Sequence, residues 1–152
     1  MKLSNKGRYG VRALFDIAFH NDGRPTQIKD ISERAAIPAR FLEQIFQDLK
    51  RAGLVGAKRG PRGGYHLAKP ALEIRLGDVV RALEGPIEIT GTTESPSPKH
   101  PADGTEVTDA IFRELSRRIE GCFDDVTIAD ICRRGEDLGL RKRTRDRQAY
   151  VI

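Results

Sequence analysis

Apolar positions along the first half of the chain recur at the three- and four-residue intervals of amphipathic helices. The first helix is expected to begin at Ser4 or Asn5, either of which can cap it, and the sequence NDGRP at residues 21–25 ends it. A second, shorter helix is expected to follow, with Thr26 as its cap. The residues predicted to face the core are Val11, Leu14, Phe15 and Ala18 in the first helix and Ile28, Ile31 and Ala35 in the second.

A third helix is predicted over residues 39–52, because Pro38 suits its start and Gly53 suits its end. Two short strands over 54–58 and 65–67, joined by a turn over 59–64, then form a hairpin. The sequence IRLGDVVRALEG supplies a fourth helix. This order of elements predicts a winged helix-turn-helix domain over residues 1–85. The buried stripes are Phe41, Leu42, Ile45, Phe46 and Leu49 in the third helix and Leu76, Val79, Val80 and Leu83 in the fourth.

The second half of the chain is predicted to contain a variable loop at 86–104, two helices at 105–135 and a basic, flexible tail at 136–152. The first of the two helices is long, from about 106 to 123, and its apolar stripe exceeds what one small winged helix could cover. The stripe could pack within its own subunit, but we expect it to pair two subunits. It comprises Val107, Ile111, Leu115, Ile119, Cys122, Phe123 and Val126. The predicted fold is therefore mostly α with a small β-wing and a long C-terminal dimerisation helix.

Charge is distributed unevenly along the chain. Residues 1–85 carry 16 basic and 9 acidic side chains, whereas residues 86–135 carry 6 and 10. A cationic N-terminal half makes a polyanionic partner plausible. The N-terminus has no apolar signal region, and no apolar run is long enough to span a bilayer. We therefore expect a cytoplasmic protein with no membrane partner.

Four polar residues share the face of the third helix opposite its apolar stripe. Arg40, Glu43, Gln44 and Gln47 follow the spacing i, i+3, i+4 and i+7. Arginine can bind guanine with two hydrogen bonds, glutamine can bind adenine, and glutamate can accept a hydrogen bond from cytosine. On spacing alone, an ordinary solvated helix face is the better interpretation, since every surface helix has such a stripe. In a helix-turn-helix domain, however, this is the helix that enters the major groove and reads its bases.

The turn of the hairpin combines stiffness with positive charge. Lys58, Arg59 and Arg62 lie among three glycines and Pro61. A glycine-rich turn with incidental charge is the simpler interpretation. Glycine lets a backbone approach another surface closely, and arginine suits a narrow minor groove. Beside the polar helix face, the turn adds a second contact element of matching character, so we favour binding to double-stranded DNA.

Three segments together resemble the Rrf2 family of bacterial transcription regulators: LSNKGRYGVRALFDIA, IKDISERAAIPARFLEQIFQDLKRAGLVGAKRGPRGGYHLAK and LGDVVRALEG. The resemblance is dense over 1–85 and looser through the long helix. It implies a homodimer on a palindromic operator. It places Arg40, Glu43 and Gln44 at base-reading positions, Arg59 on the minor-groove wing and Tyr9 at a phosphate. Arg62 is an extra cation where related proteins have a small residue.

The chain departs from this family at the iron–sulfur site. The resemblance implies three cysteines before the long helix, yet residues 86–110 contain none, and Glu106 and Asp109 stand where IscR-like members have a cysteine and a histidine. Because such clusters need thiolates, we expect no iron–sulfur cluster and no other cofactor or metal. Cys122 and Cys132 suit small buried apolar positions; a thiol switch, or a cluster shared between subunits, is the alternative. His100, Glu106 and Asp109 could bind a hard metal, but a solvated loop explains them better.

The sequence therefore predicts a dimeric DNA-binding regulator that acts as a repressor. The alternative is a regulator controlled by a protein partner, a small-molecule effector or a thiol switch. An enzyme ranks last, because the sequence contains no recognisable pairing of nucleophile and base, no phosphate-binding loop and no carboxylate dyad.

Overall fold

The computed structural model describes residues 2–89 and 104–143. The element order is α1 (Asn5–Asn21), α2 (Ile28–Ala35), α3 (Ala39–Arg51), β1 (Val55–Lys58), β2 (Gly64–Leu67), η1 (Ala71–Glu73), α4 (Leu76–Glu84), α5 (Gly104–Asp124) and α6 (Ile128–Asp137). The strands pair antiparallel, with Val55 opposite Leu67 and Lys58 opposite Gly64. This arrangement is the predicted winged helix-turn-helix, mostly α with a small wing.

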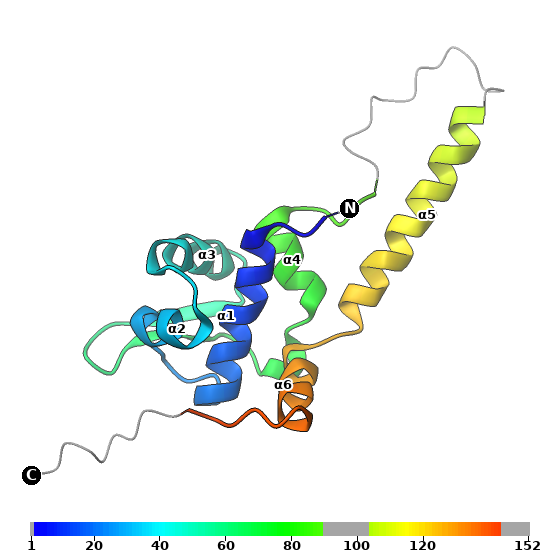
Figure 1. Cartoon of the computed structure of the whole chain (residues 1–152). Coiled ribbons are helices and arrows are strands. Elements are labelled where there is room, and N and C mark those ends of the chain that lie inside the picture. Colours follow the sequence, from blue (N-terminus) through cyan, green and yellow to red (C-terminus); the bar gives the residue numbers. More distant parts are fainter. Residues whose placement is uncertain (1, 90–103, 144–152) are drawn as a thin grey trace, which may run out of the picture.

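Helix α1 lies at the centre of the N-terminal domain and packs against α2, α3, α4 and α6 (Figure 1). Its start is capped as predicted, because the Ser4 hydroxyl accepts a hydrogen bond from the Gly7 amide at 3.3 Å. Its inner face also carries a buried carboxylate, Asp16, to which the Arg34 guanidinium of α2 donates through Nη2 (2.7 Å) and Nε (3.1 Å). This two-point pair satisfies the buried charge and joins the first two helices.

The core is closed by residues from every helix except α5. Those exposed by 1% or less include Leu14, Ile17, Ile31, Leu42, Ile45, Phe46, Leu49, Val79 and Ile128. Ile128 belongs to α6, whose start is tied to the start of α4 by two backbone hydrogen bonds, from Leu76 N to Val126 O (2.7 Å) and from Ile128 N to Ile74 O (2.9 Å). The last helix therefore packs into the same core as α1, α2, α3 and α4.

Helix α5 extends away from the rest of the molecule (Figure 1). One basic residue holds its C-terminal end: Arg81 of α4 donates to Glu120 (2.8 Å) and Asp124 (2.7 Å) of α5 and to Asp78 of its own helix (3.0 Å). The three carboxylates raise the pKa of Arg81 further, with Asp124 contributing most. This Arg81 clamp fixes the direction in which α5 leaves the domain.

Two sequence expectations about local structure are wrong. Thr26 does not cap α2; the N-cap is Gln27, and it makes no side-chain cap hydrogen bond. Thr26 instead pairs with Tyr65, through an amide-to-carbonyl hydrogen bond in each direction at 2.8 and 2.9 Å. Phe41 is not buried: 46% of it is exposed, because its position falls at the edge of the α3 apolar stripe. No helix in the described part of the chain is long and apolar enough to cross a membrane.

Candidate nucleic-acid interface

The outer face of α3 carries the four polar residues singled out from the sequence. Arg40, Glu43, Gln44 and Gln47 are all exposed, while the opposite face of the same helix is buried in the core. We call these four residues the polar ridge. Arg40 forms no ion pair within the described residues; its guanidinium lies 5.0 Å from the centroid of the Phe41 ring. A free guanidinium and three side chains able to form hydrogen bonds on one rigid face suit base recognition.

One end of the polar ridge is tied to α1. Lys6 of α1 forms an ion pair with Asp48 of α3, and Arg51 donates to the same carboxylate at 3.2 Å. These contacts hold the pKa of Asp48 below its ordinary value; the hydrogen bond from Lys6 is the largest cause, and one from Gln44 contributes least. The ion pair between Lys6 and Asp48 therefore joins α1 to the helix that carries the polar ridge.

Tyr9 lies beside the first turn of α3. Its ring centroid is 6.5 Å from that of Phe41, with the two rings tilted by 52°, and the Arg12 guanidinium lies 5.5 Å above the Tyr9 ring. The structure thus brings Tyr9 close to the end of α3 that carries Arg40. Its assignment to a phosphate contact stays a prediction.

The wing is fixed to the inner side of α3 by an aromatic pair. The Tyr65 ring of β2 stacks on Phe46 with centroids 4.5 Å apart and planes 11° apart. The pairing of Tyr65 with Thr26 holds the same strand to the segment before α2. The hairpin therefore cannot swing independently of α3.

The tip of the wing is also tethered. The Gln27 side chain at the start of α2 donates to the Pro61 carbonyl at 3.1 Å. Lys58, Arg59 and Arg62 are exposed, and none of them forms an ion pair within residues 2–89 and 104–143. Three unpaired cations on a held loop are available to a polyanion. Sequence patterns missed Thr26 and Gln27 as anchors of the wing, because helical periodicity carries no signal for such pairings.

The N-terminal part of the apolar stripe of α5 is not covered by the other residues that the structure describes. Val107 is 68% exposed and Ile111 is 52% exposed, and Leu115 is exposed as well, whereas Ile119 and Phe123 are half-buried. The other side of α5 is polar: Glu120 and Asp124 meet Arg81 of α4, and the buried Ser116 hydroxyl accepts from the amide of Ile89, in the segment after α4, at 2.9 Å. This exposure fits the expectation that the stripe does not pack within its own subunit, and its role in pairing two subunits stays a prediction.

The two cysteines lie in different surroundings, and both are free. Cys132 is half-buried on α6, and burial raises the pKa of its thiol to about 11. Cys122 is exposed on α5, so the expectation that it fills a buried position is wrong for the single chain. It follows Ile111, Leu115 and Ile119 around the helix and belongs to the same uncovered face.

The donor set does not fit a cysteine-held iron–sulfur cluster. Such clusters take Cys thiolates as their main ligands. The chain offers Cys122 and Cys132 alone. Within the described ranges, no group of three or more His, Cys, Asp or Glu side chains is placed to hold a metal. Glu106 and Asp109 lie on the first turns of α5, and His100 lies outside the described residues.

Comparison with known proteins agrees with this geometry. The sequence model of the Rrf2 family, described as an iron-dependent transcriptional regulator, matches residues 3–134. The transcriptional regulator IscR of Vibrio atlanticus is 38% identical over 144 residues, which cover 94% of this chain and 82% of that protein. IscR of Escherichia coli O1:K1 is 36% identical over 150 residues, covering 96% and 90%.

Solved structures show the same similarity. IscR of T. potens superposes with a TM-score of 0.71 at 32% identity, covering 94% of each chain. CymR, the global cysteine regulator of B. subtilis, superposes with a TM-score of 0.72 at 30% identity, covering 88% of this chain and 98% of that one. The chain therefore belongs to the Rrf2 family of transcription regulators.

Proposed function

We propose that this protein is a sequence-specific, dimeric repressor that binds a palindromic DNA operator. The observation that carries the proposal is the joining of the polar ridge and the cationic wing into one rigid unit by the Phe46–Tyr65 stack. A winged helix-turn-helix domain places such a helix in the major groove, and a basic wing beside it can reach the neighbouring minor groove. Regulators of this family bind DNA and are not enzymes.

The two contact elements would have different tasks. Arg40, Glu43, Gln44 and Gln47 would discriminate bases, while Lys58, Arg59, Arg62 and Tyr9 would supply affinity through the backbone and the minor groove. Contacts to phosphates set affinity and its dependence on salt, whereas contacts to base edges set sequence preference.

Glu43→Ala and Arg59→Ala should separate these tasks. Loss of Glu43 is expected to change the ratio of affinities between operator variants by about 10- to 100-fold, because one base-edge contact discriminates by about 1–3 kcal/mol. Loss of Arg59 is expected to weaken binding to all duplexes and to reduce the slope of log affinity against log salt by about one. Fluorescence anisotropy over a set of operator variants at several salt concentrations measures both.

Two exposed residues outside the interface serve as controls, Glu73→Ala for charge loss and Arg117→Ala for loss of a basic side chain. Neither is expected to change affinity or preference. An equal loss on every sequence for Glu43→Ala would contradict its base-reading role.

We further propose that the stripe of α5 forms the dimer seam, with Val107, Ile111, Leu115, Ile119 and Phe123 facing the partner subunit. Its exposure supports this, since a stripe of this length is seldom left in water. Ile111→Glu should convert the dimer to a monomer, because it buries an unpaired charge in the seam. Sedimentation equilibrium measures the change of mass. Affinity for an operator with two half-sites should also fall about 100-fold or more, because a monomer cannot bind both half-sites at once.

Arg117→Glu is the matched control, because Arg117 is exposed on the same helix but lies away from the stripe. It should leave the dimer intact. A dimer that survives Ile111→Glu with unchanged mass would show that the seam lies elsewhere.

We also propose that the regulator works without the family's iron–sulfur cluster, because its two thiols cannot supply the usual ligands. Anaerobically purified protein should contain neither iron nor acid-labile sulfide in stoichiometric amounts and should lack visible absorption. Stoichiometric iron and sulfide, with duplex affinity that changes when they are removed by a chelator, would contradict this.

A thiol switch is the second candidate for the signal. The raised pKa of Cys132 argues against reactivity there, because the thiolate is the reactive form. Cys122 is exposed and lies on the proposed dimer seam, so a bond between subunits would involve this residue. Control by a protein partner is favoured by no particular contact among the described residues.

A further inference from the structure

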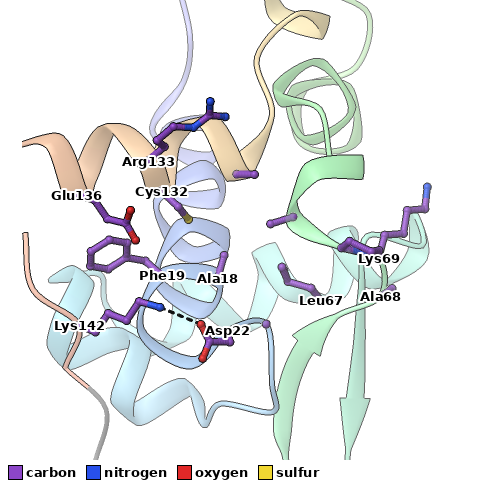
Figure 2. Close-up of a pocket in the computed structure, with 14 residues that line it drawn as sticks. Ala18, Phe19, Asp22, Leu67, Ala68, Lys69, Cys132, Arg133, Glu136 and Lys142 are labelled. Carbon is purple, nitrogen blue, oxygen red and sulfur yellow. Dashed lines mark hydrogen bonds and ion pairs between the residues drawn. The ribbon is translucent and has the colours of Figure 1, made fainter.

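A hollow of about 800 Å³ lies where the end of α1, the end of β2 and one face of α6, from Ala129 to Glu136, meet (Figure 2). Small and apolar side chains line its floor, and the alanines among them leave the space open. Known small-molecule sites have volumes of roughly 300–1,000 Å³ and mostly apolar walls. The floor residues are Ala18 and Phe19 of α1, Leu67 of β2, Ala71 of η1 and Ala129 of α6.

Opposite charges lie side by side at one edge of this hollow. Lys142, in the segment after α6, donates to the carboxylate of Asp22 at 3.0 Å, and Glu136 of α6 lies on the same side (Figure 2). Glu136 and Lys142 both act electrostatically on the thiol of Cys132, so both lie near it. The Glu136 carboxylate has no hydrogen bond or ion pair with any described residue.

The Cys132 sulfur points into the hollow between these charges and the apolar floor (Figure 2). Burial raises its pKa to about 11, so the group is a neutral thiol at physiological pH. A neutral thiol behaves as a small, polarizable apolar group. It therefore extends the apolar floor and is not a nucleophile.

We propose that the hollow binds a small zwitterion with an apolar body, of the class of free α-amino acids. The ligand ammonium would donate to Glu136 and Asp22, and Lys142 would donate to the ligand carboxylate. The apolar side chain would lie on the floor between Ala18, Leu67 and Ala129. A ligand with an ammonium alone would bind Glu136 but make no use of Lys142, which stays paired with Asp22. A ligand with a carboxylate alone would share Lys142 with Asp22 and leave Glu136 without a partner.

Such a ligand would contact both the wing, which is proposed to bind DNA, and α6, which is not. Leu67 ends the strand of the wing, and its amide donates to the Gly23 carbonyl at 3.0 Å, whereas Glu136 belongs to α6. An occupant touching both would bias the position of α6 relative to the wing and to α3, which holds the wing. This part of the inference rests on the proposed function; the binding itself does not.

Titration calorimetry on the full chain without DNA tests the binding. The probes are L-leucine, its decarboxylated form 3-methylbutylamine and its deaminated form 4-methylpentanoate, with L-methionine and L-phenylalanine as further zwitterions. At least one amino acid should bind, and for leucine each single-charge analogue should bind about tenfold more weakly or worse, because hydrogen bonds to charged groups are lost.

Glu136→Gln should weaken the amino acid about tenfold and leave binding of 4-methylpentanoate unchanged, because only the ammonium loses its charged partner. Asp137→Asn is the matched control, since Asp137 is the next exposed acid of α6 and does not line the hollow. The proposal is overturned if no probe binds at 10 mM, which is on the order of the weakest Kd that would count as binding. Equal binding of leucine and its amine, or equal effects of the two substitutions, also overturns it.

Operator affinity measured with and without the bound amino acid tests the coupling separately. A change of about fivefold or more is expected, and its loss in Glu136→Gln ties it to this hollow. Calorimetric binding with no change in operator affinity refutes the coupling alone. A protein that binds the amino acid but no duplex refutes the proposed function and leaves the site standing.

Discussion

Replacing Phe46 by alanine is expected to lower the free energy of unfolding by about 3–5 kcal/mol, the usual cost of removing a buried ring. Phe46 is fully buried, and its outer neighbour is the Tyr65 ring, stacked at 4.5 Å. The substitution opens a cavity in the core and also removes the support of the wing. Urea denaturation followed by circular dichroism measures the loss.

Phe41→Ala provides the matched control on the same helix. Because Phe41 is largely exposed and packs only partly, through Tyr9 and Arg40, its removal should cost about 1 kcal/mol or less. A loss for Phe41→Ala as large as that for Phe46→Ala would show that the apolar stripe is rotated from its place in the structure.

Replacing Gly64 by alanine is expected to detach the wing and to weaken duplex binding by about tenfold or more, since its backbone conformation alone would cost about 1–3 kcal/mol with any side chain. Its φ is +135°, and an added Cβ would collide with the Thr26 carbonyl oxygen and lie 2.8 Å from the Gln27 amide nitrogen. Tyr65 could then no longer pair with Thr26. Fluorescence anisotropy on an operator duplex measures the loss, and the helical circular dichroism should persist.

Gly121→Ala is the control for adding a methyl group. Gly121 lies in α5, has no atom within 4 Å of an added Cβ and has ordinary helical geometry. Alanine there should stabilise the helix by about 0.5–1 kcal/mol and leave duplex binding unchanged. Wild-type duplex affinity in Gly64→Ala would contradict the role given to the held wing.

Much of the fold follows from the helical spacing of apolar residues and from the residues that begin or end each helix. Ser4 caps α1 as expected, Gly53 follows the end of α3 with a φ of +76°, and the apolar stripe of α5 recurs at helical spacing. These features are local, so a sequence displays them directly. Phe41 misled because its position falls at the edge of the α3 stripe, where a small difference in helix rotation decides between core and solvent.

The features that the sequence did not predict depend on contacts between distant segments. Thr26 has the side chain of a helix cap, but its backbone pairs with Tyr65, a tertiary contact that local propensity cannot show. The Arg81 clamp likewise joins two helices, α4 and α5, that residues 85–103 separate in the sequence. The hollow beside Cys132 arises from three alanines on α1, η1 and α6, none of which carries a recognisable motif.

The polar ridge and the aromatic stack occupy opposite sides of one short helix. Stability is supplied by the inward side, through Phe46 and its buried neighbours, while the outward residues make few internal contacts. Glu43 or Gln47 can therefore be replaced by other residues during evolution with little loss in the free energy of unfolding. A lineage of such proteins could acquire new target genes by substitutions on the outer surface alone, while the inner rings are retained.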